Sequence, residues 1–306
     1  MTFSPLEVGP VEPEDDVVEE DLRIPAWRLL IGNPITLISV LVLVAVVIIA
    51  VIGQWIAPYG INEIDVPRAL QGPSGAHWLG TDDLGRDIFS RILVATRVSI
   101  QVAVVSVLFA FVIGVTLGIV SGYVGGWVDA VLMRIVDVMF AFPVILLALA
   151  IIAILGPSVA STTLAIGVVY TPIFARVARA STLSARTETF VQVSQTMGTP
   201  TWRILLKRIL PNIAAPLMVQ TSLSLAFAIL SEAALSFLGL GVQPPQPSWG
   251  RMLYDAQGFV GQAWWMSVFP GAAIFITVLA FNLVGDGLRD VMDPKQRSIM
   301  EARKRR

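Results

Sequence analysis

A polar segment interrupts the long apolar stretches of this chain: Thr187-Glu-Thr-Phe-Val-Gln-Val-Ser-Gln-Thr-Met-Gly-Thr-Pro-Thr-Trp-Arg-Ile-Leu-Leu-Lys-Arg-Ile-Leu-Pro-Asn212. Its pattern predicts two short helices. Gly198 can adopt the left-handed backbone conformation that closes the first helix. Thr199 is a good N-cap for the second helix, and Pro200 suits its first turn because the missing N–H would be unpaired there. We expect Pro211 to help end the second helix.

Two interpretations fit a helix, a glycine turn and a second helix. One is a DNA-reading module, which has this arrangement. However, uncharged segments long enough to span a bilayer lie on both sides of the polar segment. This placement favours the other interpretation, a docking surface for a cytosolic partner that is held between membrane spans.

The composition indicates an integral membrane protein. Of the 306 residues, 55% are hydrophobic and 14% are charged, whereas a soluble domain carries about 25% charged residues. The net charge of -1 argues against nucleic acid as a partner.

The chain offers few groups for catalysis. It has no cysteine and a single histidine, His77, so thiolate metal sites, cysteine nucleophiles and histidine clusters are excluded. None of the lysines follows a glycine, and the Gly-Lys loop that binds phosphate in many ATPases is therefore missing. We expect no catalytic residue, no metal site and no ATP hydrolysis by that route.

Six segments are long and apolar enough to cross a membrane. Residues 35–57, for example, would cover roughly 30 Å as a helix, which is the thickness of the bilayer core. The uncharged run 138–175 is too long for one helix, and Gly156-Pro157-Ser158 divides it. The six predicted spans are residues 35–57, 98–128, two segments within 128–175, 213–240 and 263–285.

An even number of spans places both termini on one side of the membrane. Arginine and lysine are more numerous on that side, which predicts that it is the cytoplasmic side. The terminal side holds Arg23, Arg28, Arg186, Arg203, Lys207, Arg208, Arg289, Lys295, Arg297, Arg303, Lys304, Arg305 and Arg306, and the other side holds Arg68, Arg86, Arg91, Arg97 and Arg251.

These features divide the chain into four parts. Residues 1–24 are acidic and predict a disordered cytoplasmic tail. Residues 25–97 would hold the first transmembrane helix and an outer loop with an interfacial helix. Residues 98–290 would hold five transmembrane helices and the cytoplasmic loop 184–212, and residues 291–306 a basic cytoplasmic tail.

The interfacial helix of the outer loop is expected to precede the second span. Thr81 would cap it, with Asp82 and Asp83 in its first turn, where acidic groups suit the helix dipole. A role as a structural brace is favoured over substrate contact. Its apolar face would consist of Leu84, Ile88, Ile92 and Ala95.

The polar segment resembles the cytoplasmic coupling loop of ABC-importer permeases. That loop has the pattern Glu-Ala-Ala, three further residues, Gly, and a Leu-Pro about a dozen residues later. The matching positions are Gln192-Val193-Ser194, Gly198 and Leu210-Pro211. The Glu-Ala-Ala is replaced here, so a charge that the family often has at this place is missing.

Further motifs resemble the DppC/OppC-type subunits of peptide importers. They cover roughly residues 28 to 296 in the order found in the peptide/nickel branch of the family. The motifs are His77-Trp-Leu-Gly-Thr-Asp-Asp-Leu-Gly-Arg-Asp-Ile-Phe-Ser-Arg91, Gly122-Tyr-Val-Gly-Gly-Trp-Val-Asp129 with Met133-Arg134, Asp137 and Ala141-Phe-Pro143, Ser236-Phe-Leu-Gly-Leu-Gly-Val-Gln-Pro-Pro-Gln-Pro-Ser-Trp-Gly250, and Asn282-Leu-Val-Gly-Asp-Gly-Leu-Arg-Asp290.

The resemblance implies a fold and a set of partners. The fold is an all-α membrane protein with six transmembrane helices, the type I ABC importer permease fold, with both termini cytoplasmic. The partners are a second, DppB/OppB-like permease subunit, two cytosolic ABC ATPases, an extracytoplasmic substrate-binding protein and the lipid bilayer of a prokaryotic cell (inner or plasma) membrane. ATP and Mg would be bound by the ATPases, and this chain would hold no cofactor.

The resemblance also implies a role for the polar segment and a class of cargo. The residues expected to contact and couple the ATPases are Gln192, Gly198, Thr199, Pro200, Trp202 and Arg203. The cargo would be a dipeptide or an oligopeptide; a nickel chelate, glutathione or an oligosaccharide remains open.

Charged residues within or beside the spans suggest further roles. Arg134 with Asp137 and Asp286 with Arg289 are each one helical turn apart, which predicts structural ion pairs. Glu232 is the carboxylate within the fifth span, and it would either line the translocation pathway or pair with a basic group.

The proline-rich outer loop 243–250 could contact the receptor or be a simple connector. Its prolines fix the backbone, so little order has to be gained on binding. Pro245 and Trp249 are the candidate contacts.

Two other classes of protein compete with the importer hypothesis. An ATP-independent channel or secondary transporter should show more ionisable groups in its spans or an inverted repeat, and neither is clear here. An integral membrane enzyme would need a catalytic cluster that this sequence does not assemble.

Overall fold

A computed structural model describes residues 33–292 of the chain, and helices make up most of this range. Five helices are long and apolar enough to span a membrane, and a bent pair forms a sixth candidate. The five are α2 (Pro34–Ile56), α3 (Ile88–Val124), α6 (Val159–Ala185), α10 (Ala214–Phe237) and α12 (Trp265–Met292). The all-α membrane architecture predicted from the sequence is confirmed. The predicted tails 1–24 and 291–306 lie outside the described residues, apart from the last two residues of α12.

The predicted third span is bent rather than straight. Helix α4 (Gly126–Phe140) and helix α5 (Val144–Leu155) meet at 90°. Pro143 precedes α5 and cannot donate the backbone hydrogen bond that would continue α4. The predicted break after α5 is confirmed, because Gly156 takes a φ of 81° and the side chain of Ser158 caps α6.

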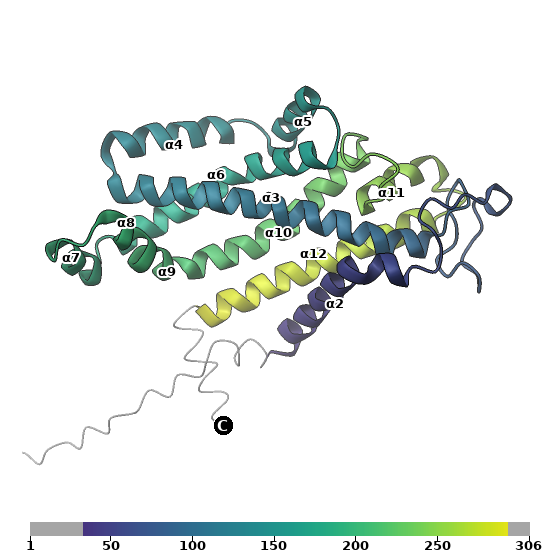
Figure 1. The fold of residues 1–306 in the computed structure, drawn as a ribbon, viewed down its shortest axis with the longest axis horizontal. Coiled ribbons are helices and arrows are strands. Elements are labelled where there is room, and N and C mark those ends of the chain that lie inside the picture. The colour runs from purple at the N-terminus through teal and green to yellow at the C-terminus, as the bar shows by residue number, and fades with distance from the viewer. Residues whose placement is uncertain (1–32, 293–306) are drawn as a thin grey trace, which may run out of the picture.

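The centre of the fold is the packing of α3 against α6, which lie side by side through the middle of the molecule (Figure 1). Three glycines of α3, one turn apart, face α6. A Cβ at Gly114, Gly118 or Gly122 would collide with backbone carbonyl oxygens of α6. Small residues at this spacing let two membrane helices approach closely, and close approach is what holds helices together in lipid.

The remaining long helices surround this pair. Helix α10 packs against α3, α6 and α12, and α2 packs against α3 and α12. Helix α4 lies along the opposite side of the α3–α6 pair from α2 (Figure 1). Most apolar side chains of α2 are exposed, as expected of a helix that faces lipid.

The predicted interfacial helix starting at Thr81 is wrong. Residues 81–87 form a tight turn in which the Asp82 carboxylate accepts the backbone N–H groups of Leu84 and Arg86. Gly85 takes a φ of 76° there, a conformation that ends any helix. Asp87, not Thr81, is the N-cap, and α3 then runs without interruption for 37 residues.

The orientation of the chain in the membrane can be tested with single cysteines, because the chain has none of its own. Thr201 and Gln246 are both exposed. Thr201 begins α8 (Thr201–Ile204) and Gln246 precedes α11 (Trp249–Ala256), and these two helices lie toward opposite ends of the molecule (Figure 1). We expect Thr201→Cys to react with an impermeant maleimide only from the cytosol, and Gln246→Cys only from outside. Reversed labelling would overturn the orientation predicted from the positive charges.

Candidate functional site

The polar segment 187–212 forms a compact helical tip beyond one end of the α3–α6 pair (Figure 1). Its first helix, α7 (Thr189–Thr196), ends in a Schellman turn. The N–H of Gly198 donates to the carbonyl of Gln195, and the N–H of Thr199 donates to the carbonyl of Ser194, each at 3.0 Å. Gly198 takes a φ of 71°, which confirms its predicted left-handed conformation.

The second helix begins one residue later than predicted. Helix α8 (Thr201–Ile204) has Pro200, not Thr199, at its N-cap position, and no side chain caps it. Thr199 is unavailable because it already belongs to the turn that closes α7.

Pro211 does not end the second helix, contrary to the prediction. A π-helical turn, η2 (Leu205–Ile209), follows α8, and α9 (Leu210–Asn212) continues the helical path. The widened turn lies where the ring and the missing N–H of Pro211 would disturb regular α-helical bonding. Helix α10 follows within two residues, so the tip is joined to a membrane span almost without a linker.

The tip has a buried side and an exposed side. Val191, Ile204 and Ile209 are at most 1% exposed and join the hydrophobic core. The other side presents Trp202, which is 57% exposed, with the guanidinium of Arg203 5.3 Å from its ring centroid. Val193, Met197 and Leu206 are also exposed. An exposed apolar surface on well-anchored helices can bind another protein.

The predicted coupling residues differ in where they lie. Gln192, Gly198, Pro200 and Trp202 are exposed, whereas Thr199 is half-buried. The side-chain amide of Gln192 donates to the backbone carbonyl of Thr187 at 3.1 Å.

Polar contacts connect the tip and the end of α6 to α3 and α4. Arg186 donates to the backbone carbonyl of Gly122 at 3.0 Å, and Gln195 donates to the hydroxyl of Tyr123 at 3.0 Å. Two turns further into α6, Arg179 donates to the carboxylate of Asp129 at 2.6 Å. Local sequence patterns do not predict these contacts, because they join residues 50 or more positions apart.

The predicted ion pair between Arg134 and Asp137 is wrong. Asp137 instead pairs with Arg176 of α6 at 2.8 Å, because this side of α4 faces α6. Within residues 33–292, Asp286 and Arg289 do not pair either; both are exposed, and an exposed pair gains little over hydration.

Glu232 is fully buried in α10 and is bound by serines, not by a basic group. The hydroxyl of Ser99 donates to its Oε2 at 3.1 Å, and the hydroxyl of Ser236 donates to its Oε1 at 2.7 Å. The same hydroxyl oxygens accept the backbone N–H groups of Trp249 and Val242. Both predicted roles of Glu232, lining a pathway or pairing with a cation, are therefore absent from this conformation.

The Glu232 cluster holds the outer loop 238–249 against α10 and α3. Trp249 is only 2% exposed, so its predicted contact with a receptor is wrong. It begins helix α11 (Trp249–Ala256), and a Cβ on the next residue, Gly250, would collide with the backbone of Ala233 in α10. Pro245 is exposed and remains a candidate contact.

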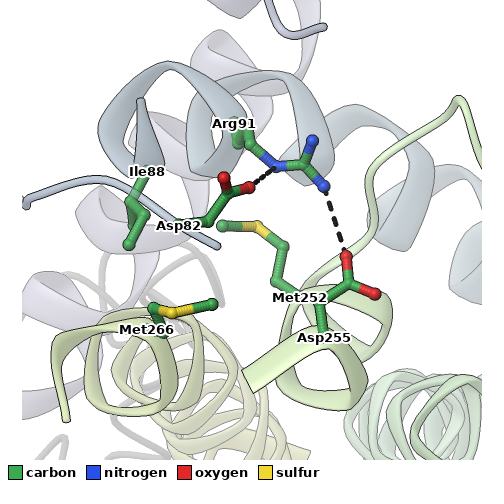
Figure 2. Close-up of a pocket in the computed structure, with 6 residues that line it drawn as sticks. All are labelled: Asp82, Ile88, Arg91, Met252, Asp255 and Met266. Carbon is green, nitrogen blue, oxygen red and sulfur yellow. Dashed lines mark ion pairs between the residues drawn. The ribbon is translucent and has the colours of Figure 1, made fainter. Parts of the chain in front are cut away.

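A charged cluster joins the first turn of α3 to α11 (Figure 2). Arg91 is 3% exposed and lies 3.7 Å from Asp82 and 3.6 Å from Asp255. Arg86 pairs with the same Asp82 at 2.6 Å. The cavity between these groups has a volume of about 10 Å³ and is closed by Ile88, Met252 and Met266. It is too small for cargo, so this cluster is structural.

Comparison with known proteins decides the family. Residues 114–298 match the family described as binding-protein-dependent transport system inner membrane component, and residues 25–73 match the N-terminal TM domain of oligopeptide transport permease C. The chain belongs to this permease family. The resemblance noted in the sequence is thereby confirmed.

Several curated proteins resemble this permease over nearly its whole length. It is 44% identical to the dipeptide transport system permease protein DppC of Alkalihalophilus pseudofirmus, over 94% of each chain. It is 45% identical to the glutathione transport system permease protein GsiD of Pectobacterium atrosepticum, over 89% of this chain and 91% of that protein. It is 43% identical to the probable D,D-dipeptide transport system permease protein DdpC of Escherichia coli, over 86% of this chain and 89% of that protein.

A solved structure supports the type I permease fold. The chain matches the inward-facing MetNI methionine ABC transporter with a TM-score of 0.56 and 20% identity, over 66% of this chain and 96% of that chain. Residues 33–292 contain no group of three or more acidic or histidine side chains that could hold a metal ion.

The serine-bound carboxyl of Glu232 gives a test of the permease's outer loop. Glu232→Leu should leave the hydroxyls of Ser99 and Ser236 without an acceptor, at a cost of about 1–3 kcal/mol. We expect a lower unfolding temperature and less assembled complex. Glu232→Gln, which keeps an acceptor and adds a donor, should lose much less. Equal stability of the Leu variant and the unaltered protein would contradict the structural role.

Proposed function

We propose that this permease subunit imports dipeptides or oligopeptides, driven by two cytosolic ATPases to which its helical tip, residues 187–212, binds. The observation that carries the proposal is the exposed apolar surface of the tip, set on buried anchors and continuous with α10. The family and the names of its relatives support this assignment. The tip would lie on the cytoplasmic side of a prokaryotic cell membrane.

The chain's own part in this function is mechanical. ATP and Mg would be bound by the ATPases, and closure of the ATPases would move the tip. The tip cannot move alone, because Val191, Ile204 and Ile209 are packed in the core and Gln195 is bonded to Tyr123 at the end of α3. The motion would therefore pass to the α3–α6 pair and open the pathway on the outer side.

The proposed assembly supplies what this chain lacks. A second, DppB/OppB-like permease subunit would form the other half of the pathway. An extracytoplasmic substrate-binding protein would deliver the cargo and could contact the exposed Pro245. Glutathione is the second candidate cargo, because a relative at 45% identity is named for it.

Gly198 provides the sharpest test of the tip. A Cβ at this position would meet nothing within 4 Å, so a substitution acts through the positive φ alone. Gly198→Val should strain the turn by more than about 1 kcal/mol. We expect a near-normal amount of protein in the membrane, a sharp fall in uptake and loss of the ATPases in a pull-down. Gly198→Asn is the matched control, because asparagine tolerates this conformation and should retain more activity. Normal transport by the Val variant would show that the tip does not couple the ATPases.

The cargo can be identified in the same membranes. ATP-driven uptake would be measured with the cognate binding protein, once with a labelled dipeptide and once with labelled glutathione. We expect uptake of the dipeptide. If glutathione is taken up and dipeptides are not, the second candidate replaces the first. If neither is taken up while ATP-driven transport of another solute continues, the peptide assignment is wrong and the coupling role of the tip stands.

A further inference from the structure

An open apolar groove lies between α2 and α3 and has a volume of about 430 Å³. The two helices cross closely at one end, where a Cβ on Gly53 would collide with the carbonyl of Leu93. From this crossing α2 diverges from α3 toward Pro34 (Figure 1). The walls of the groove are formed by Val47, Ala50 and Val51 of α2 and by Ile100, Val104 and Val105 of α3.

A single cation lines the groove, near its crossing end. The guanidinium of Arg97 is exposed and donates to Oε1 of Gln54 at 3.2 Å. Among residues 33–292, no carboxylate lies within ion-pair distance of it. Four of its five N–H donors are thus directed to no described partner. Beside it, Trp55 is 70% exposed, and exposed tryptophans are typical of the boundary between hydrocarbon and headgroups.

We propose that this groove binds an anionic phospholipid. Its phosphate would accept hydrogen bonds from the guanidinium of Arg97, a geometry for which arginine is well suited. Its acyl chain would lie along the valine-rich walls. An anionic headgroup fits the groove better than a zwitterionic one, because the residues that line the groove include no carboxylate that could bind an ammonium group. A zwitterionic lipid would leave its ammonium group without a protein partner.

A lipid bound in the groove would help to hold α2 in place. Helix α2 packs mainly against α3 and α12 and leaves most of its apolar surface uncovered. A lipid in the groove would fill the space on one side of it. The lipid would therefore hold α2 at its present angle to α3, beyond the direct contact at Gly53.

The test measures lipid retained by the purified transport complex. Native mass spectrometry would compare phosphatidylglycerol with phosphatidylcholine, added in equal amounts. We expect a preference for phosphatidylglycerol that falls about tenfold in Arg97→Gln. Arg134→Gln is the matched control, because Arg134 is also exposed and without an ion-pair partner among the described residues, but lies on α4. It should leave the preference unchanged. Equal retention of both lipids by the unaltered complex, or an unchanged preference in Arg97→Gln, would overturn the proposal.

A second variant tests the groove itself. Val104→Trp should fill the groove and reduce retention while Arg97 stays intact. If retention is unaffected, the headgroup contact alone binds the lipid, and the groove proposal is wrong.

The rival occupant is the partner permease. Val51→Cys would be the only cysteine of the chain. In native membranes it should react with a lipid-soluble maleimide. An efficient cross-link from this position to the partner permease would show that protein covers the groove and would overturn the proposal.

Discussion

The close approach of α3 to α6 is the contact on which the rest of the structure depends. It exists because Gly114, Gly118 and Gly122 place no side chain between the two backbones. In a bilayer, lipid tails solvate apolar side chains as well as protein does, so close packing must replace the hydrophobic effect as the force between helices. Helices α4, α5 and α10 all contact this pair, and the tip 187–212 is an extension of its end.

The polar contacts at the two ends of the molecule differ in burial. At the end that holds loop 238–249, Arg91 and Glu232 are buried and bonded on several sides, so that the loops there are held in one arrangement. At the other end the polar contacts are partly exposed, as with Asp137 and Arg176. Buried polar groups need all their partners, whereas exposed ones can exchange partners with water. This difference fits the proposed function, in which the tip would dock on the ATPases while the opposite end stays rigid.

The sequence predicts the elements of this fold better than their contacts. The apolar runs give the spans, and Gly198 and Gly156 mark the turns, because length and backbone conformation are local properties. The wrong predictions about contacts between side chains have a common cause. Arg134 and Asp137 satisfy the spacing of a helical pair, but Asp137 finds a better-placed partner on another helix. The positions of Trp249 and Glu232 along the chain suggest a receptor contact and a pathway or ion-pair role, yet the burial of both side chains depends on loop 238–249 folding back on α10. Such contacts join distant residues, and local patterns do not contain them.

The uninterrupted length of α3 has a further consequence. At 1.5 Å per residue its 37 residues extend for about 55 Å, well beyond the hydrocarbon thickness of a bilayer. One end carries Arg91, and the other reaches Gly122, where Arg186 is bound. A rod of this kind behaves as a lever, because a tilt imposed at one end displaces the other end in the opposite direction. In the proposed function, a single stiff body of this length would correlate events on the two faces of the membrane in time, without a chain of intermediate rearrangements between them.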